Sequence, residues 1–279
     1  MTVTVLHVLF LIMQGSLSLF CIFVLGFAIE RIRPVDPSID SPGLVRNGVI
    51  GFCFVFVREW TSFLLALTIV SSWTGVFIFI GVSDGGSILK CFGLGFAWLA
   101  ARDFFYYWLH RMQHASKWLW AEHALHHSEE SMNVTTSIRH HYLEFPLTVL
   151  FVNVPLLYLI KPPVLSLTIV VSILSVTEIS NHMNLRLGLG RFAWIIATPQ
   201  NHRIHHSPQP EHIDKNFAAF FPIWDVLFGT YYRPNRGEYP STGLAGGQRV
   251  TTTRQALLLP FTMWRKMVRG DRNEQSAGS

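Results

Sequence analysis

Residues 104–127 read FFYYWLHRMQHASKWLWAEHALHH and join an apolar, aromatic run to two histidine clusters. On an α-helix, residues three and four positions apart lie on one face, so His110 and His114 can point at a single site. The aromatic residues 104–108 continue the apolar segment 91–101, and together they are nearly long enough to cross a bilayer. The stretch therefore predicts a helix that leads from an apolar region to a polar site rich in imidazole.

A second arrangement, H-x-x-H-H, occurs twice, about eighty residues apart: the two copies are His123, His126, His127 and His202, His205, His206. Neighbouring residues on a helix point about 100° apart. In such a triad the two adjacent imidazoles can therefore each reach a different ion, while the first histidine completes a chelate. Two triads that face each other would bracket a pair of metal ions.

Twelve of the thirteen histidines lie between His110 and His212, and His7 is the exception. Nine of them form helix-compatible clusters: His110, His114, His123, His126, His127, His182, His202, His205 and His206. A four-coordinate zinc site is filled by four ligands, and an iron with open positions needs three to five, so this number favours a binuclear centre. A lone histidine in an apolar helix is usually a satisfied polar residue, and we expect no metal role for His7.

Half of the 279 residues are hydrophobic and only 14% are charged, a composition typical of membrane proteins. Three apolar stretches are long enough, or nearly so, to cross a bilayer: residues 3–28, 60–83 and 91–101, the last of which continues into the aromatic residues 104–108. Two shorter apolar segments, 145–160 and 164–177, follow and are joined by Lys161, Pro162 and Pro163. The prediction is an all-α, polytopic membrane helical bundle with a cytoplasmic, histidine-rich helical cap that holds a binuclear metal site.

Basic residues after the first and third apolar segments indicate the orientation. They are Arg31, Arg33 and Arg46, then Arg111, Lys117 and Arg139. The positive-inside rule places both loops in the cytoplasm, and the short hairpin then returns His182 to the same side as the other clusters. The first segment has no basic start and no small-residue cleavage site, so we expect a retained anchor rather than a signal peptide.

Three regions follow from these patterns. Residues 1–99 are expected to hold the N-terminal transmembrane helices, and residues 100–233 the catalytic region with a membrane hairpin at 145–181. Residues 234–279 are expected to form a loop, an amphipathic helix over 252–269 that lies on the membrane, and a disordered tail. Pro260 would kink that helix.

The net charge is modest, since 22 basic and 17 acidic residues give +5. Attraction to anionic lipid headgroups explains it, and we expect no nucleic-acid partner. Cys21, Cys53 and Cys91 lie in or beside apolar stretches without C-x-x-C spacing. We expect small hydrophobic side chains in a reducing compartment rather than a disulfide framework or an iron–sulfur cluster.

The order of the motifs carries a resemblance. H-x-x-x-H, H-x-x-H-H, a later H-x-N and H-x-x-H-H are followed by DKNF at 214–217 and IWDVLFGTY at 223–231. Over roughly residues 100–233 this pattern resembles the fatty acid hydroxylase and sterol desaturase superfamily of membrane di-iron oxygenases. The resemblance implies that the nine clustered histidines bind two iron ions. Some relatives have a tenth histidine where this chain has Arg186, which leaves Asn184 or Glu178 as a substitute, or one ion more open.

Several other polar residues are candidates for catalytic or supporting roles. Arg139–Glu144, RHHYLE, resembles the R-x-H-P-x-E segment of the family, so His141 and Glu144 are candidates for orienting or gating roles, with helix-start packing as the alternative. Asp103 lies two turns before His110 and is a candidate to anchor a ligand imidazole, or else a polar residue paired with Arg102 or a neighbouring helix. Asn201 and Asp214 are likewise candidates to support a ligand imidazole, with an ordinary structural role as the alternative.

The resemblance implies an oxidoreductase that uses O₂ and external electrons to hydroxylate a C–H bond of a lipid. No dinucleotide motif, cysteine cluster or haem domain is recognisable, so we expect a separate ferredoxin, cytochrome or reductase as electron donor. A lipid or sterol desaturase and a carotenoid oxygenase are alternatives with the same site. A non-enzymatic membrane haem or metal-binding electron carrier, or a metal transporter, is an alternative of another class.

Overall fold

The computed structural model describes residues 20–37, 40–72, 88–159 and 164–270, and within them every regular element is helical. A short helix, Phe20–Ile29, comes first. The labelled elements are α2 (Ser41–Ser72), α3 (Ile88–Ala115), α4 (Lys117–His127), η1 (Val134–Ile138), α5 (Glu144–Thr148), η2 (Val149–Asn153), α6 (Val154–Leu159), α7 (Val164–His182), η3 (Gly190–Phe192), α8 (Pro199–His205), α9 (Ile223–Phe228) and α10 (Thr253–Arg269). The described part agrees with the predicted all-α class.

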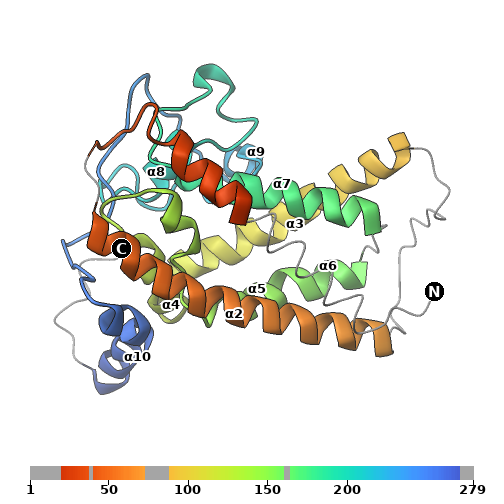
Figure 1. The fold of residues 1–279 in the computed structure, drawn as a ribbon, viewed down its shortest axis with the longest axis horizontal. Helices are drawn as coiled ribbons and strands as arrows, with labels where there is room; N and C mark the ends of the chain where they lie inside the picture. The colour runs from red at the N-terminus through yellow and green to blue at the C-terminus, as the bar shows by residue number, and fades with distance from the viewer. Residues whose placement is uncertain (1–19, 38–39, 73–87, 160–163, 271–279) are drawn as a thin grey trace.

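The long helices run side by side along the molecule, and the short ones gather at one end. Figure 1 shows α2, α3 and α7 along the long axis, with α4, α8, α9 and α10 at the left. Helix α3 packs against both α7 and α4, and α7 packs against α8. Both long helices that carry histidines, α3 and α7, therefore end at the same pole of the molecule.

One helix of the described residues is long and apolar enough to cross a membrane, the segment Ser41–Leu65 of α2. Only 17% of its most apolar stretch is buried inside the protein, so most of its side chains face away from the protein interior. This span starts about twenty residues before the predicted 60–83, because α2 continues through Arg58 and Glu59, which pair with each other at 2.6 Å. Residues 73–87, and most of the predicted first segment, lie outside the described residues.

Helices occupy both arms of the predicted hairpin. The first arm contains α5, α6 and between them a π-helical turn, η2. Pro155 has no N–H to donate to the helical ladder, and π-turns occur where a ladder is disturbed in this way. The second arm is α7. The predicted Lys161–Pro163 connection lies outside the described residues.

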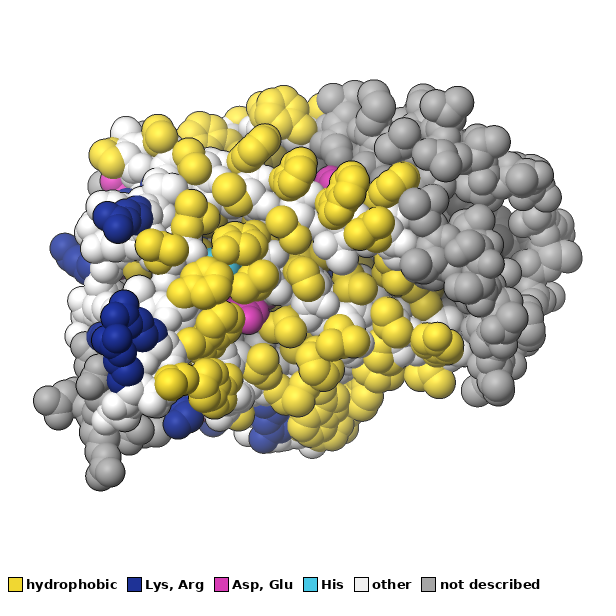
Figure 2. Space-filling view, turned by 90° about the horizontal axis from the view of Figure 1, so that it is seen from below, with side chains coloured by type: hydrophobic (Ala, Val, Ile, Leu, Met, Phe, Trp, Pro, Cys, Tyr) yellow, Lys and Arg dark blue, Asp and Glu magenta, His cyan; other side chains and the backbone are white. Residues whose placement is uncertain are grey.

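The surface separates apolar and basic side chains. Figure 2 shows hydrophobic side chains along the flank of the molecule and Lys and Arg side chains gathered towards the end that carries the short helices. Exposed aromatic residues on α2 and α3 include Phe52, Phe56 and Phe96. This division is expected when one part of a protein contacts lipid and the other contacts water.

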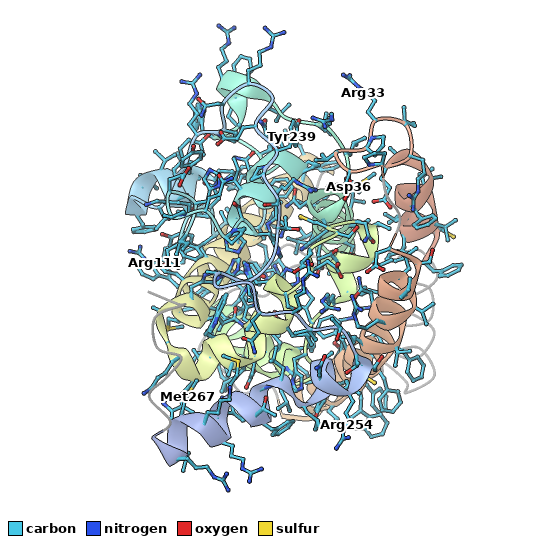
Figure 3. The ribbon with its side chains drawn as sticks, turned by 90° about the vertical axis from the view of Figure 1, so that its left-hand side faces the viewer. Arg33, Asp36, Arg111, Tyr239, Arg254 and Met267 are labelled. Carbon is cyan, nitrogen blue, oxygen red and sulfur yellow. The ribbon has the colours of Figure 1, made fainter. Side chains whose placement is uncertain are left out.

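The C-terminal region contains the predicted loop and helix. Residues 234–250 form no regular element, and α10 starts with a capping box between Thr252 and Gln255. Pro260 lies inside the helix, at the second turn. Figure 3 shows α10, labelled by Arg254 and Met267, along one edge of the polar end. Part of its apolar face, Ala256 and Leu259, is buried against α2 and α4, so this part is not free for a membrane. Residues 271–279 lie outside the described residues.

Candidate metal centre

Helices α3 and α4 form the first wall of the site. Helix α3 carries His110 and His114 on one face and ends at Ala115, and Ser116 occupies the N-cap of α4. Ser116 has an extended backbone with φ −104° and ψ 116°, which separates the two helices by a single residue. The turn brings the Nε2 atoms of His110 and His123 to 3.0 Å from each other, so two clusters separated by 13 residues meet directly.

Helices α7 and α8 form the opposite wall. His182 is the last residue of α7. Helix α8 starts at Pro199, where a proline is tolerated because the first N–H of a helix has no partner, and the Thr198 hydroxyl accepts a hydrogen bond from the Asn201 backbone N–H. The Nε2 atoms of His202 and His182 lie 2.8 Å apart.

The nine histidines form two groups, and in each group the potential ligand nitrogens lie within 4.8 Å of one another. One group contains His110, His114, His123, His127 and His205, and the other contains His126, His182, His202 and His206. The two adjacent pairs are each divided between the groups, as the helical geometry of H-x-x-H-H predicts. Each group offers enough nitrogen donors for one metal ion.

The Nδ1 atoms of six of the nine histidines face oxygen atoms, whereas that of His206 is buried without a partner in the described part of the chain. Four of them donate to backbone carbonyls: His110 to Phe217 at 2.7 Å, His126 to Arg139 at 3.3 Å, His182 to Glu178 at 2.7 Å and His205 to Lys215 at 2.8 Å. A carbonyl oxygen can only accept, so these rings carry their proton on Nδ1 and leave the Nε2 lone pair free. Metal-binding histidines have this outer partner as a rule, because it fixes the tautomer and the ring direction.

Burial keeps the imidazoles neutral. Burial, and then the neighbouring histidines, hold the pKa values of His127, His202, His205 and His206 well below the usual value. The His205 Nε2 atom is buried and has no hydrogen-bond partner in the described part of the chain. Buried polar atoms are rarely left unpaired, and a neutral imidazole with a free, inward lone pair is what a metal ion requires.

Two buried carboxylates hold the segment that supports His110. Asp225 accepts hydrogen bonds from the backbone N–H groups of Phe217 and Ala218 at 2.7 and 3.0 Å. Asp103, expected as an anchor for an imidazole, instead accepts from the N–H groups of Phe220 and Phe221. Its support for the site is indirect, through the backbone of the segment that contains Phe217. Sequence reasoning missed the role of Asp225, although the quoted IWDVLFGTY contains it.

The loop before α5 contributes a different histidine from the one predicted. His141 packs away from the two groups, with its Nε2 3.1 Å from the Leu257 carbonyl of α10. His140 faces the groups: its ring stacks on that of His126 with centroids 4.0 Å apart. Glu144 accepts from His123 at 2.8 Å and from His140 at 3.0 Å. The four-residue spacing between His140 and Glu144 is the sequence signal that could have identified this pair.

The candidates for a tenth ligand lie outside both groups. Asn184 binds the N-terminal segment, accepting from the backbone N–H groups of Val35 and Asp36. Arg186 donates to the carbonyls of Pro34 and Val35 and lies over the Tyr239 ring, near which Figure 3 shows Asp36. The side chain of Glu178 is half exposed and lies 3.9 Å from His140. Asn184 and Arg186 thus connect the segment after α7 to residues 34–36, and Arg186 also contacts the loop that contains Tyr239.

Asp214 and Asn201, the remaining two candidates, contact His114 and the start of α8. The Asp214 carboxylate lies 3.3 Å from His114 Nδ1, and its backbone has a positive φ of 58°. The Asn201 amide accepts a hydrogen bond from the Thr198 hydroxyl and donates to the Ala193 carbonyl, which fixes the start of α8. His7 lies outside the described residues.

A cavity opens beside the two groups on the side of the long helices. Among the side chains that line it are His110, His126, His182 and His202, together with apolar residues such as Phe54 and Leu174. A second, smaller hollow reaches His114, His127 and His205 from the other side. Small-molecule sites commonly combine apolar walls with a few polar groups in this way.

The fatty acid hydroxylase family model matches residues 95–230, the segment that contains all nine clustered histidines. This region belongs to the fatty acid hydroxylase family. The chain is 33% identical over 191 residues to alkylglycerol monooxygenase from Xenopus tropicalis, a match that covers 68% of this chain and 37% of that protein.

Two further relatives have related names. The human alkylglycerol monooxygenase is 38% identical over 133 residues, 48% of this chain and 29% of that protein. An ornithine lipid hydroxylase from Rhizobium tropici is 30% identical over 148 residues, 53% of this chain and 44% of that protein. The chain therefore matches less than half the length of each of these three relatives. No solved structure matches the chain.

Proposed function

We propose that this protein is a membrane-bound di-iron oxygenase that uses O₂ and external electrons to hydroxylate a C–H bond of a lipid. The single observation that carries the proposal is the division of nine buried histidines into two groups, each with its nitrogens within 4.8 Å. The relatives, named as monooxygenases and a hydroxylase of lipids, support the reaction class and the substrate class.

The donor set fits iron. The ligands are neutral imidazoles without thiolate, a set that suits iron, copper, nickel and zinc. Bound iron would supply the activation of O₂. Five histidines would hold one ion and four the other, and His123 would link its ion to Glu144 and His140. Glu144 accepts a hydrogen bond from the Nδ1–H group of His123, which increases the electron density that the ring gives to a metal.

The protein's own contribution is to bind the lipid, orient it and exclude water. The cavity beside His110, His126, His182 and His202 has apolar walls for a hydrocarbon chain. Which carbon meets the metal, and whether a second hydrogen is removed to give an alkene, would depend on where the lipid's polar end is held.

The membrane arrangement is part of the proposal. We infer a multi-pass chain whose histidine groups lie on the cytoplasmic side, supported by the apolar flank and basic end in Figure 2 and by the span Ser41–Leu65. Electrons would come from a separate ferredoxin, cytochrome or reductase. The smaller hollow at His114 and His205 is the approach to the five-histidine group on the side away from the lipid cavity.

The test is metal content per chain on protein purified in detergent without added metal, together with an optical spectrum and an O₂-dependent lipid oxidation assay. We expect about two irons per chain, no haem Soret band, and a product that carries an added oxygen. A Soret band would favour the electron carrier instead. Metal near zero with no oxidation of any lipid would overturn the proposal.

A further inference from the structure

One face from each of several helices lines the cavity beside the histidine groups. On α3 the lining residues are Arg102, Tyr106 and His110, which are four positions apart, and α7 contributes Glu178 and His182 at the same spacing. A helix rises 1.5 Å per residue, so the eight positions from Arg102 to His110 correspond to about 12 Å. The cavity therefore extends from the histidines past two turns of α3.

The same cavity receives Phe54 and Arg58 from α2, one helical turn apart. The Phe54 ring lies 5.0 Å from that of His140, at the histidine end, so Arg58 lies further along the cavity. In Figure 1, α2 runs away from the end that carries the short helices and α3 runs towards that end. Arg58 follows Phe54 on α2 and Arg102 precedes His110 on α3, so both arginines lie further from that end than these neighbours. Two guanidinium groups thus line the cavity, together with five histidines, two carboxylates and a set of aromatic and aliphatic side chains that includes Phe145 and Leu174.

The two arginines differ in their partners. Arg58 is paired with Glu59 at 2.6 Å. Arg102 forms no ion pair within the described residues, and its guanidinium lies 5.7 Å from the centre of the Tyr106 ring. Both oxygens of the adjacent Asp103 already accept backbone N–H groups of Phe220 and Phe221.

The carboxylates that face the cavity from other helices also have partners. Glu144 accepts from His123 and His140, and the half-exposed Glu178 carboxylate lies 3.9 Å from His140 Nε2. An ionisable side chain among apolar helices is costly, and it generally marks a ligand or ion site when no protein partner neutralises it. A guanidinium binds carboxylate and phosphate groups with paired hydrogen bonds.

We propose that Arg102 binds the anionic group of the lipid substrate, a carboxylate or a phosphate, while the hydrocarbon part extends along the cavity to the histidine groups. This inference rests on the proposed function and names its substrate class as anionic amphiphiles. Arg102 then acts as a positioning residue: its separation from His110 determines which carbon lies beside the metal ions. Neutral lipids of the same length lack this anchor and bind more weakly.

The experiment compares three ligands of equal chain length, namely a fatty acid, an alkyl phosphate and an alkylglycerol. Binding to the detergent-purified, metal-loaded protein and O₂-dependent oxidation are measured for the wild type, Arg102→Gln and Arg102→Lys. We expect Arg102→Gln to weaken binding of the anionic ligands roughly ten- to hundredfold, the loss typical of a hydrogen bond to a charged group, and to leave the alkylglycerol unchanged. Arg102→Lys should restore part of the binding.

The control is Arg191→Gln, because Arg191 is exposed in η3 and lies over the Phe192 ring. Unchanged binding of the alkylglycerol shows that a variant is folded. Preference for the fatty acid or for the alkyl phosphate identifies carboxylate or phosphate as the anion. The inference is overturned if the wild type binds all three ligands equally, or if Arg102→Gln weakens all three alike. If the wild type oxidises no lipid while binding the anionic ones through Arg102, the proposed function fails and the anion site stands.

Discussion

The Nδ1 atom of His110 lies 2.7 Å from the carbonyl oxygen of Phe217, a residue 107 positions later in the chain. This bond fixes the tautomer of a histidine in the five-histidine group, and it depends on the conformation of a loop that contains no metal ligand. The Phe217 N–H is in turn held by Asp225. The direction of one ring of the metal centre therefore depends on a carboxylate two hydrogen bonds away.

Replacement of Asp225 by asparagine should lower both stability and metal content. The carboxylate accepts from Phe217, Ala218 and the Thr230 hydroxyl, and an amide has only one oxygen to offer. Leaving a buried N–H without an acceptor costs about 1–3 kcal/mol. Chemical denaturation and elemental analysis would measure the two effects. A matched substitution at Glu211, which is exposed, should change neither; metal content at the wild-type level in Asp225→Asn would contradict the role of Asp225.

His206→Ala should remove one metal ion and leave the other. His206 belongs to the four-histidine group, whose remaining three ligands are His126, His182 and His202. We expect the metal content to fall from about two to about one per chain, because the five-histidine group keeps all of its donors. His212→Ala is the control, since His212 is equally buried but lies 3.2 Å from Glu238 and outside both groups. Equal metal loss in both variants would argue against the two-group arrangement.

The adjacent residues His140 and His141 should respond oppositely to replacement by alanine. His140→Ala removes the ring that stacks on His126 and binds Glu144, so we expect reduced lipid oxidation with the unfolding midpoint less affected. His141→Ala loses a buried contact with α10 and should cost about 1–3 kcal/mol of stability, with full oxidation per folded molecule. Turnover and thermal unfolding of both variants provide the comparison. Reduced oxidation in His141→Ala, with full oxidation in His140→Ala, would instead assign the functional role to His141.

The metal-free protein should become less stable as the pH falls. In the folded state burial holds the pKa values of His127, His202, His205 and His206 well below the usual value of about 6.5. Below that pH the unfolded chain takes up protons that the folded chain does not. Stability is therefore full above about pH 6.5 and decreases below it, by up to about 1.4 kcal/mol per pH unit for each histidine.

Thermal unfolding midpoints of the metal-free protein between about pH 8 and about pH 5 would measure this slope. A midpoint independent of pH below 6.5 would show that these imidazoles are not buried and neutral in the metal-free state.

Helical periodicity alone predicted much of the site. The three- and four-residue spacings place His110 with His114 and divide His126 from His127, and the structure has both arrangements. The all-α class followed from long apolar runs in the same way. These predictions depend on local geometry, which a helix repeats every 3.6 residues whatever its surroundings.

Only the tertiary structure decided which distant residues share a group and what orients them. His205 joins the histidines of α3 and α4 while His206 joins His126, because the packing of α8 against α7 places these two adjacent residues between the groups. Loops also decide three other features. His140 rather than His141 faces the histidine groups, Asp103 binds backbone N–H groups, and Asn184 binds the segment that contains Val35 and Asp36. Loop conformation has no sequence period, since it is fixed by hydrogen bonds to residues more than a hundred positions away, as between His110 and Phe217.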